Sequence, residues 1–257
     1  SMFDEQPQEE LLAADALKTT FGKNINNTEH QYFLIETQAQ MDELLKKLNA
    51  SDKICFDTET TSVDANNCEL VGISFCIHPS EAYYVPISPN QEEAKKQIHQ
   101  FKSVLENESI TKIGQNIKFD QLVLKWYDIE VKGVFFDTML AHYLIDADTK
   151  HNMNVLSETY LGYSPISIET LIGKKGKGQL SMREVPIEQI KEYAAEDADV
   201  TLQLKEKFEP MLANAATQQL FEEVELPLIP VLADMEAEGI TLDKAALGEL
   251  SVALEKD

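Results

Sequence analysis

Apolar positions in the first third of the chain recur at strand spacing and at helix spacing in turn. The run 32–35 predicts a short strand. Thr37 is placed to cap a helix that extends to about Leu48, because its apolar residues fall on one helical face. Three further apolar runs predict strands at 53–57, 69–77 and 82–87. The short polar connections between these runs favour an antiparallel meander.

From residue 91 onward, helical and strand-like segments alternate. The spacing predicts two short strands, at 111–114 and 134–136, and helices at 91–105, 117–127, 138–145 and 153–161. Residues 163–185 read as a loop, and Pro186 opens a long helix through about Phe208. Three antiparallel strands followed by β-α-β units predict an α/β protein whose mixed sheet carries helices on its faces.

Composition indicates a globular protein and argues against membrane proteins and proteins with a wide nucleic-acid-binding surface. The 257 residues are 43% hydrophobic, which is enough to bury a substantial core. No apolar run reaches the roughly 18 residues of a membrane span, so no membrane association is expected. The formal charge of −23 argues against a protein that grips nucleic acid over a wide surface. It leaves room for a narrow cleft in which metal ions neutralise a few phosphates.

Asp57 and Glu59 are the most informative pair of residues. Asp57 is the last residue of the run 53–57, and Glu59 follows two residues later. Residues two apart in a strand point to the same face of the sheet. Two adjacent carboxylates at the end of a buried strand resist ionisation unless a cation lies between them. Oxygen ligands of this kind suit Mg²⁺ or Mn²⁺. The alternative is a strand end that turns polar as it reaches solvent.

Two later segments add acids at helical spacing. Asn116 and Asp120 lie one turn apart at the start of one predicted helix, and Tyr193 and Asp197 lie one turn apart in the long one. Three alanines around Asp197 would let that helix approach the sheet closely: Ala194, Ala195 and Ala198.

In type and order these motifs resemble those of the DEDD exonuclease superfamily, whose domain has a ribonuclease H-like fold. The segments 57–60, 114–120, 136–140 and 193–199 look like the 3′–5′ proofreading exonuclease domain of bacterial DNA polymerase I, a family A polymerase. Residues 223–243 are similar to the start of the catalytic half of that polymerase. The resemblance covers roughly residues 30–257 and implies a mixed sheet of five to six strands, with an antiparallel meander plus parallel strands, flanked by helices.

The resemblance implies a role for each matching residue. Four carboxylates would hold two divalent metal ions, Mg²⁺ or Mn²⁺: Asp57, Glu59, Asp120 and Asp197. Tyr193 occupies the position that defines the tyrosine subtype and, with the four acids, would complete the catalytic set by orienting the attacking water. Three neighbouring polar residues are expected to contact nucleic acid: Thr58, Gln115 and Asn116. For Gln115 and Asn116 the alternative is that they satisfy backbone groups at the helix start.

The implied activity is a metal-dependent 3′–5′ exonuclease that removes nucleoside 5′-monophosphates from single-stranded or frayed DNA 3′ ends. The expected organisation is a polar N-terminal segment (1–30), the exonuclease domain (31–209) and the helical start of a polymerase domain (210–257). The rest of the polymerase is expected in cis, in a monomer of the bacterial cytoplasm. Two alternatives keep the fold: a catalytically silent scaffold, and an RNA-trimming exonuclease similar to RNase D.

Several other charged residues are assigned non-catalytic roles. Glu196 and Asp199 lie off the Tyr193 face and are expected to be solvent-exposed or structural. Asp137 precedes a predicted helix and is expected to be its N-cap. The lysine-rich loop 174–177 lacks the pattern of a phosphate-binding loop. It is expected either to touch a nucleic-acid backbone or to be a solvated loop.

Overall fold

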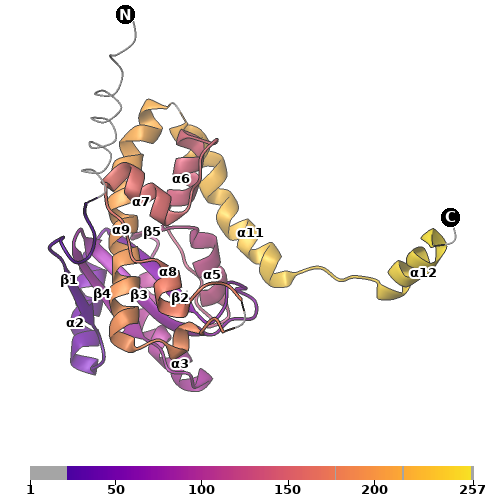
Figure 1. The fold of residues 1–257 in the computed structure, drawn as a ribbon, viewed down its shortest axis with the longest axis horizontal. Helices are drawn as coiled ribbons and strands as arrows, with labels where there is room; N and C mark the ends of the chain where they lie inside the picture. Colours follow the sequence, from indigo (N-terminus) through magenta and orange to yellow (C-terminus); the bar gives the residue numbers. More distant parts are fainter. Residues whose placement is uncertain (1–21, 177, 216, 256–257) are drawn as a thin grey trace, which may run out of the picture.

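The computed structural model describes residues 22–176, 178–215 and 217–255. Residues 1–21, which make up most of the predicted N-terminal segment, lie outside this part of the chain. Six strands form a single sheet in the order β1-β4-β3-β2-β5-β6 (Figure 1). Their bounds are Gln31–Leu34, Lys53–Thr60, Leu70–His78, Glu81–Pro86, Thr111–Gly114 and Phe135–Asp137 for β1 to β6.

The helices before the long one are short; those up to α5 lie between strands, and those from α6 onward connect β6 to the long helix. They are α2 (Gln38–Ala50), α3 (Gln91–Ile98), a 3-10 turn η1 (His99–Phe101), α4 (Lys102–Leu105), α5 (Ile117–Lys125), α6 (Thr138–Ile145), α7 (Met153–Leu161), α8 (Ile168–Ile172) and a second 3-10 turn η2 (Met182–Glu184). The long helix is α9 (Ile187–Asn214), followed by α10 (Gln218–Leu220), the π-helical turn η3 (Phe221–Glu225), α11 (Leu226–Glu238) and α12 (Lys244–Leu254).

The predicted sheet is confirmed. Strands β2, β3 and β4 form the antiparallel meander, whereas β5 and β6 add in parallel beside β2. Strand β1 pairs in parallel with β4 at the opposite edge. Thr37 caps α2 in a reciprocal capping box with Gln40, as its position in the sequence predicted.

Four predicted boundaries were wrong. Strand β2 continues to Thr60, so the two carboxylates lie within the strand rather than at its end. The helix predicted over 91–105 is interrupted by η1, and the loop predicted over 163–185 contains α8 and η2. Helix α9 runs past Pro210 because Leu212, in its last turn, is buried in the core. A proline on its own normally favours an earlier helix end.

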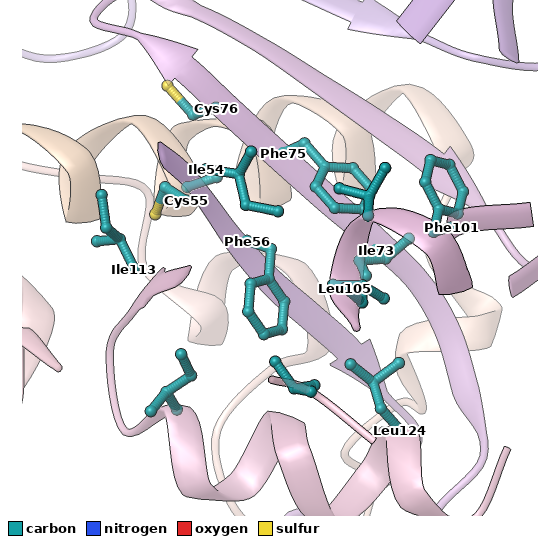
Figure 2. Close-up of a cluster of buried hydrophobic side chains, with 14 of the residues drawn as sticks. Ile54, Cys55, Phe56, Ile73, Phe75, Cys76, Phe101, Leu105, Ile113 and Leu124 are labelled. Atoms are coloured by element: carbon teal, nitrogen blue, oxygen red, sulfur yellow. The ribbon is translucent and has the colours of Figure 1, made fainter. Parts of the chain in front are cut away.

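The two faces of β2 meet different partners because successive side chains alternate. Ile54 and Phe56 point into the main core, with Phe75 and Phe101 close by (Figure 2). The rings of Phe75 and Phe101 lie 4.8 Å apart between centroids. The opposite face of β2 and β3 is covered by α9, which crosses the sheet (Figure 1). The acids at positions 57 and 59 therefore point toward α9.

The C-terminal helices begin against the domain and then leave it. Helix α11 packs on α5, where Lys118 pairs with Glu236 and Lys125 with Asp234. Helix α12 stands apart from the body of the protein (Figure 1). Among the described residues, none of the helices is both long and apolar enough to cross a membrane.

The close packing of Gly72 against Tyr84, on the sheet face that α9 covers, can be tested by substitution. A Cβ atom at Gly72 would overlap the Tyr84 ring, which crosses this position. We expect Gly72→Ala to lower the free energy of unfolding by about 1–3 kcal/mol, as overpacking does. In a Tyr84→Leu background the same change should cost less than about 0.5 kcal/mol. Urea unfolding of the four proteins checks this double-mutant cycle, and an equal cost in both backgrounds would contradict it.

Candidate metal centre and nucleic-acid groove

Three carboxylates from two distant segments meet between the sheet and α9. Asp57 and Glu59 come from β2, and Asp197 comes from the middle of α9. One oxygen from each lies within 4.8 Å of the others. Glu59 and Asp197 are only 5% and 7% exposed, and Asp57 is half-buried. The structure thus brings together three of the four acids expected at a metal site.

Small residues allow this close approach. The register of β2 with β3 places Ser74 opposite Asp57 and Gly72 opposite Glu59. From the other side, α9 contributes three fully buried alanines near Asp197: Ala194, Ala195 and Ala198. With little side-chain volume on either element, the helix backbone lies close enough for Asp197 to reach the two acids of β2.

The environment opposes ionisation of the three carboxyl groups. Burial raises the pKa of Asp57 from 3.8 to about 7. Burial, followed by the charges of Asp57 and Asp197, raises the pKa of Glu59 well above its usual range. Burial and then the charge of Asp57 do the same for the pKa of Asp197. Without a cation, the cluster therefore holds protons that exposed carboxyl groups would lose.

The cluster fits a divalent cation. Glu59 Oε1 is buried and has no hydrogen-bond partner among the described residues, although a buried polar oxygen normally has one. It belongs to a set of carboxylate oxygens, which are hard ligands suited to Mg²⁺ or Mn²⁺. A bound ion would satisfy the unpartnered oxygen and neutralise the repulsion between the acids.

Asp120 lies next to this cluster but has different hydrogen-bond partners. Strand β5 pairs with β2 only as far as Cys55, and it ends at Gly114. Beyond that point Asp120 Oδ1 accepts the backbone N–H of Thr58 at 3.0 Å and the Thr58 hydroxyl at 2.6 Å. Asp120 is 2% exposed, and burial, then the charge of Asp57, raises its pKa. It therefore ties α5 to the strand that carries the acids.

Tyr193 lies one turn before Asp197 and is half-buried beside the cluster. Burial, followed by the charge of Asp197 and then of Glu59, raises the pKa of its hydroxyl well above the usual value. The hydroxyl is protonated at neutral pH, as a tyrosine of ordinary pKa also is, and it lies within hydrogen-bonding reach of Asp197.

A groove of about 530 Å³ opens beside Glu59. One side consists of residues 58–63 together with Asn116 and Phe119. The other side comes from the segment that follows α7, through Ile168, Ile172, Gln179, Leu180 and Met182. The groove is wide open to solvent at Asn116 and is lined by both apolar and polar side chains.

The three residues expected to contact nucleic acid have different surroundings. Asn116 is exposed on the groove, in a left-handed conformation with φ of 61°. Thr58 lines the groove, but its hydroxyl is donated to Asp120. Gln115 is engaged within the protein, because its amide donates to the His151 carbonyl and its oxygen accepts the Thr138 hydroxyl. Gln115 thus has a structural role, although neither partner is a backbone group at the start of α5.

The three acids that were assigned non-catalytic roles from the sequence accept hydrogen bonds inside the protein. Glu196 is fully buried and accepts the Tyr163 hydroxyl and the Ile166 N–H. Asp199 accepts the Tyr32 hydroxyl and the Ser80 N–H. Asp137 caps α6 as predicted, and it also accepts two N–H groups at the start of α5.

The apolar wall of the groove was not identified from the sequence. Its residues lie in the segment interpreted as a loop, where Ile168 and Ile172 share one short helix and Leu180 follows three glycines. The available signal was the presence of Ile168, Ile172 and Leu180 in a mostly polar stretch. Ile168 and Leu180 are 40% and 45% exposed. Lys174 and Lys175, in the same segment, are exposed.

Comparison with known proteins places this site in a family. Residues 32–213 match the 3′–5′ exonuclease family. DNA polymerase I of Rhizobium leguminosarum is 40% identical over 86% of this chain, and that of Pseudomonas aeruginosa is 39% identical over 89%. The chain spans only 24% and 27% of the lengths of these two curated relatives.

Solved structures share the fold at low sequence identity. Brucella melitensis NrnC with bound Mg²⁺ superposes with a TM-score of 0.63 and 20% identity, over 82% of this chain and 95% of that one. The POL domain of Pol1 from M. smegmatis, in complex with DNA primer-template and dNTP, superposes with a TM-score of 0.67 and 18% identity. The match covers 87% of this chain and 35% of that one. The fold is the ribonuclease H-like one expected from the sequence. The chain belongs to the family of 3′–5′ exonuclease domains found in DNA polymerase I.

Proposed function

We propose that this domain removes nucleotides one at a time from single-stranded or frayed DNA 3′ ends, releasing nucleoside 5′-monophosphates. The observation that carries the proposal is the cluster of Asp57, Glu59 and Asp197, with an unpartnered buried oxygen on Glu59, beside an open groove. Membership of the 3′–5′ exonuclease family supports this reaction class.

The acids have distinct proposed roles. Asp57, Glu59 and Asp197 would hold one divalent ion, and Asp57 would be shared with a second. Both hydrogen bonds from Thr58 go to Oδ1 of Asp120. The other oxygen, Oδ2, accepts none in the part of the chain described, so it is the atom we assign to support of the second ion. Bound Mg²⁺ or Mn²⁺ would supply an activated water and neutralise charge on the phosphate and on the leaving 3′-oxygen.

Tyr193 would position the attacking water. Its hydroxyl is protonated at neutral pH, and burial and the nearby charges raise its pKa further. It can therefore donate a hydrogen bond to a water placed next to Asp197, while Glu59 accepts one from the same water. This fixes the orientation of the nucleophile without requiring Tyr193 to transfer a proton.

The groove supports single-strand selectivity. Between residues 58–63 on one side and Ile168, Ile172 and Leu180 on the other, apolar side chains can pack against an unpaired base. A paired end must therefore melt first, and a mispaired end melts more easily. With a charge of −23, the domain would rely on other parts of the protein for most of its DNA affinity.

The proposed context is a proofreading domain at 31–209, joined through the helices of 210–257 to a polymerase domain in cis, in a monomer of the bacterial cytoplasm. The names of the curated relatives support a DNA substrate. The silent-scaffold alternative is disfavoured because all four acids are present, and the RNA-trimming alternative is resolved by the first assay below.

The first prediction concerns activity. We expect 5′-labelled single-stranded DNA to give a shortening ladder with Mg²⁺ or Mn²⁺ and none with chelator. Asp57→Asn should reduce the rate by a factor of about 1,000 or more, because it removes the shared ligand. The control Asp148→Asn changes an exposed acid that is not part of the cluster and should leave the rate unchanged. No ladder with either metal would contradict the proposal, and faster shortening of RNA would favour the RNA-trimming alternative.

The second prediction concerns Tyr193. Tyr193→Phe keeps the ring and removes only the donor, so we expect kcat to fall by roughly tenfold to a hundredfold. Calorimetric Mn²⁺ affinity should be unchanged, because the phenol is not a ligand. An unaltered kcat would show that the hydroxyl does not orient the nucleophile.

The third prediction concerns pH. Because the folded protein holds Asp57 at a pKa of about 7, above its ordinary 3.8, the folded state binds more protons than the unfolded state between these values. This group therefore makes the metal-free protein less stable as pH rises from about 4 to about 7. Asp57→Asn should have the higher melting temperature at pH 8 without metal, by roughly 3 °C or more.

Saturating Mg²⁺ should remove this difference in melting temperature, because it stabilises the wild type and not the Asp57→Asn variant. Thermal unfolding at pH 5 and pH 8, with and without Mg²⁺, measures both effects. Equal pH dependence of the two proteins would contradict the electrostatic description of the site.

A further inference from the structure

Arg183 is a half-buried cation that connects three segments of the protein. It lies in η2, between the groove wall and the start of α9. Its Nη1 donates to the Ile87 carbonyl at 2.8 Å, and its Nη2 donates to the Leu70 carbonyl at 2.6 Å. Nε is buried without a hydrogen-bond partner among the described residues, and it lies 3.6 Å from a Glu69 carboxylate oxygen.

The two carbonyls mark the ends of β3 and β4 nearest the acids. Leu70 begins β3 and pairs with Thr60, just past an irregularity in register that follows Glu59. Ile87 follows β4, and its N–H is donated to the Val71 carbonyl. The guanidinium thus completes the hydrogen bonding of both strand ends, one residue beyond the position of a proposed metal ligand.

The residues next to Arg183 in sequence line the groove. Met182 is 3% exposed and lines the groove as it packs against Val71 and Tyr84. Leu180 lines it farther out, and its N–H is donated to the Ile172 carbonyl. The Leu180 bond holds the wall internally, whereas Met182 joins it to the sheet by apolar packing and Arg183 joins it to the sheet by hydrogen bonds.

The backbone before Leu180 gives the wall little support. Gly173, Gly176 and Gly178 have positive φ, and side-chain positions on them would meet no atom within 4 Å. With open space around these three glycine positions, Arg183 is the anchor to which we assign the distance between Leu180 and residues 58–63.

We propose that Arg183 is a positioning residue for the exonuclease reaction, which holds the wall formed by Ile172, Leu180 and Met182 at the spacing that admits one nucleic-acid strand. The inference rests on the proposed function. A planar guanidinium can donate to two divergent carbonyls at once, whereas a lysine ammonium is a point charge without that fork. Lysine is therefore not expected to replace it.

The ion pair with Glu69 is not expected to carry this role. Its atoms are 3.6 Å apart, and the Glu69 side chain is 50% exposed, so solvent screens the attraction. Glu69→Gln is a matched control, because it changes the charge beside Arg183 and leaves both carbonyl bonds in place. Glu69 does not line the groove.

The test compares wild type, Arg183→Lys, Arg183→Gln and Glu69→Gln by amide hydrogen exchange and by steady-state kinetics on a single-stranded oligonucleotide. In both Arg183 variants we expect exchange in residues 168–182 to be at least tenfold faster, with β2 unchanged. KM should rise about tenfold, with kcat within about threefold and Mn²⁺ affinity unaltered, because the acids lie on β2 and α9. Glu69→Gln should match the wild type.

If Arg183→Lys showed the same hydrogen exchange and the same KM as the wild type, the inference would be overturned. An equal rise in KM in Glu69→Gln would also overturn it. A variant that loses Mn²⁺ affinity together with kcat would show a general structural role instead, which also contradicts it. If the wild type degrades neither DNA nor RNA, the proposed function fails. Hydrogen exchange would still decide whether Arg183 holds the wall.

Discussion

The close approach of α9 to strands β2 and β3 is the constraint on which the rest of the structure depends. It brings Asp197 to Asp57 and Glu59, with one oxygen of each within 4.8 Å of the others, in a place where burial favours the neutral acids. Like charges at this separation destabilise a fold, and the effect is stronger where water is excluded. The protein tolerates the cluster because the opposite face of the same strands is packed with large apolar side chains, including Phe56 and Phe75. One face of these strands thus contributes apolar packing to the fold, and the other face carries the acids.

The same constraint explains the residues around the cluster. Gly72 leaves room for the Tyr84 ring, and the alanines of α9 leave room for the sheet. Where β5 ends, Asp120 takes over the hydrogen bonding of Thr58, so that the helix after β5 is fixed to the strand that carries the acids. Glu196 and Asp199, from the same turns of α9 as Asp197, hold Ile166 and the β3–β4 turn. Helix α9 therefore carries one acid of the cluster and is also the element to which neighbouring segments are tied.

Much of this could be predicted from the sequence, because it depends on local periodicity and on residue types. The meander, the β-α-β units and the cap at Thr37 follow from short-range patterns. The family resemblance, rather than periodicity, implied one metal site for Asp57, Glu59, Asp120 and Asp197, and the structure clusters oxygens of Asp57, Glu59 and Asp197. Long-range geometry was not accessible in this way. No local pattern indicates that Thr58 faces Asp120, that Gln115 bonds to His151, or that Arg183 reaches Leu70 and Ile87. The groove wall was missed because a glycine-rich stretch interrupts its apolar residues, whose contacts are with the sheet.

The proposed metal centre requires the buried acids to exchange protons for a divalent cation. The most direct measurement is calorimetric titration of the metal-free domain with Mn²⁺ at pH 7, in two buffers of different ionisation enthalpy. We expect binding with net release of protons, because ligands held at raised pKa values must ionise. We also expect Glu59→Gln, which keeps the shape of the side chain, to lose most of the affinity. Binding without proton release, or binding of equal strength in Glu59→Gln, would contradict the proposed metal centre.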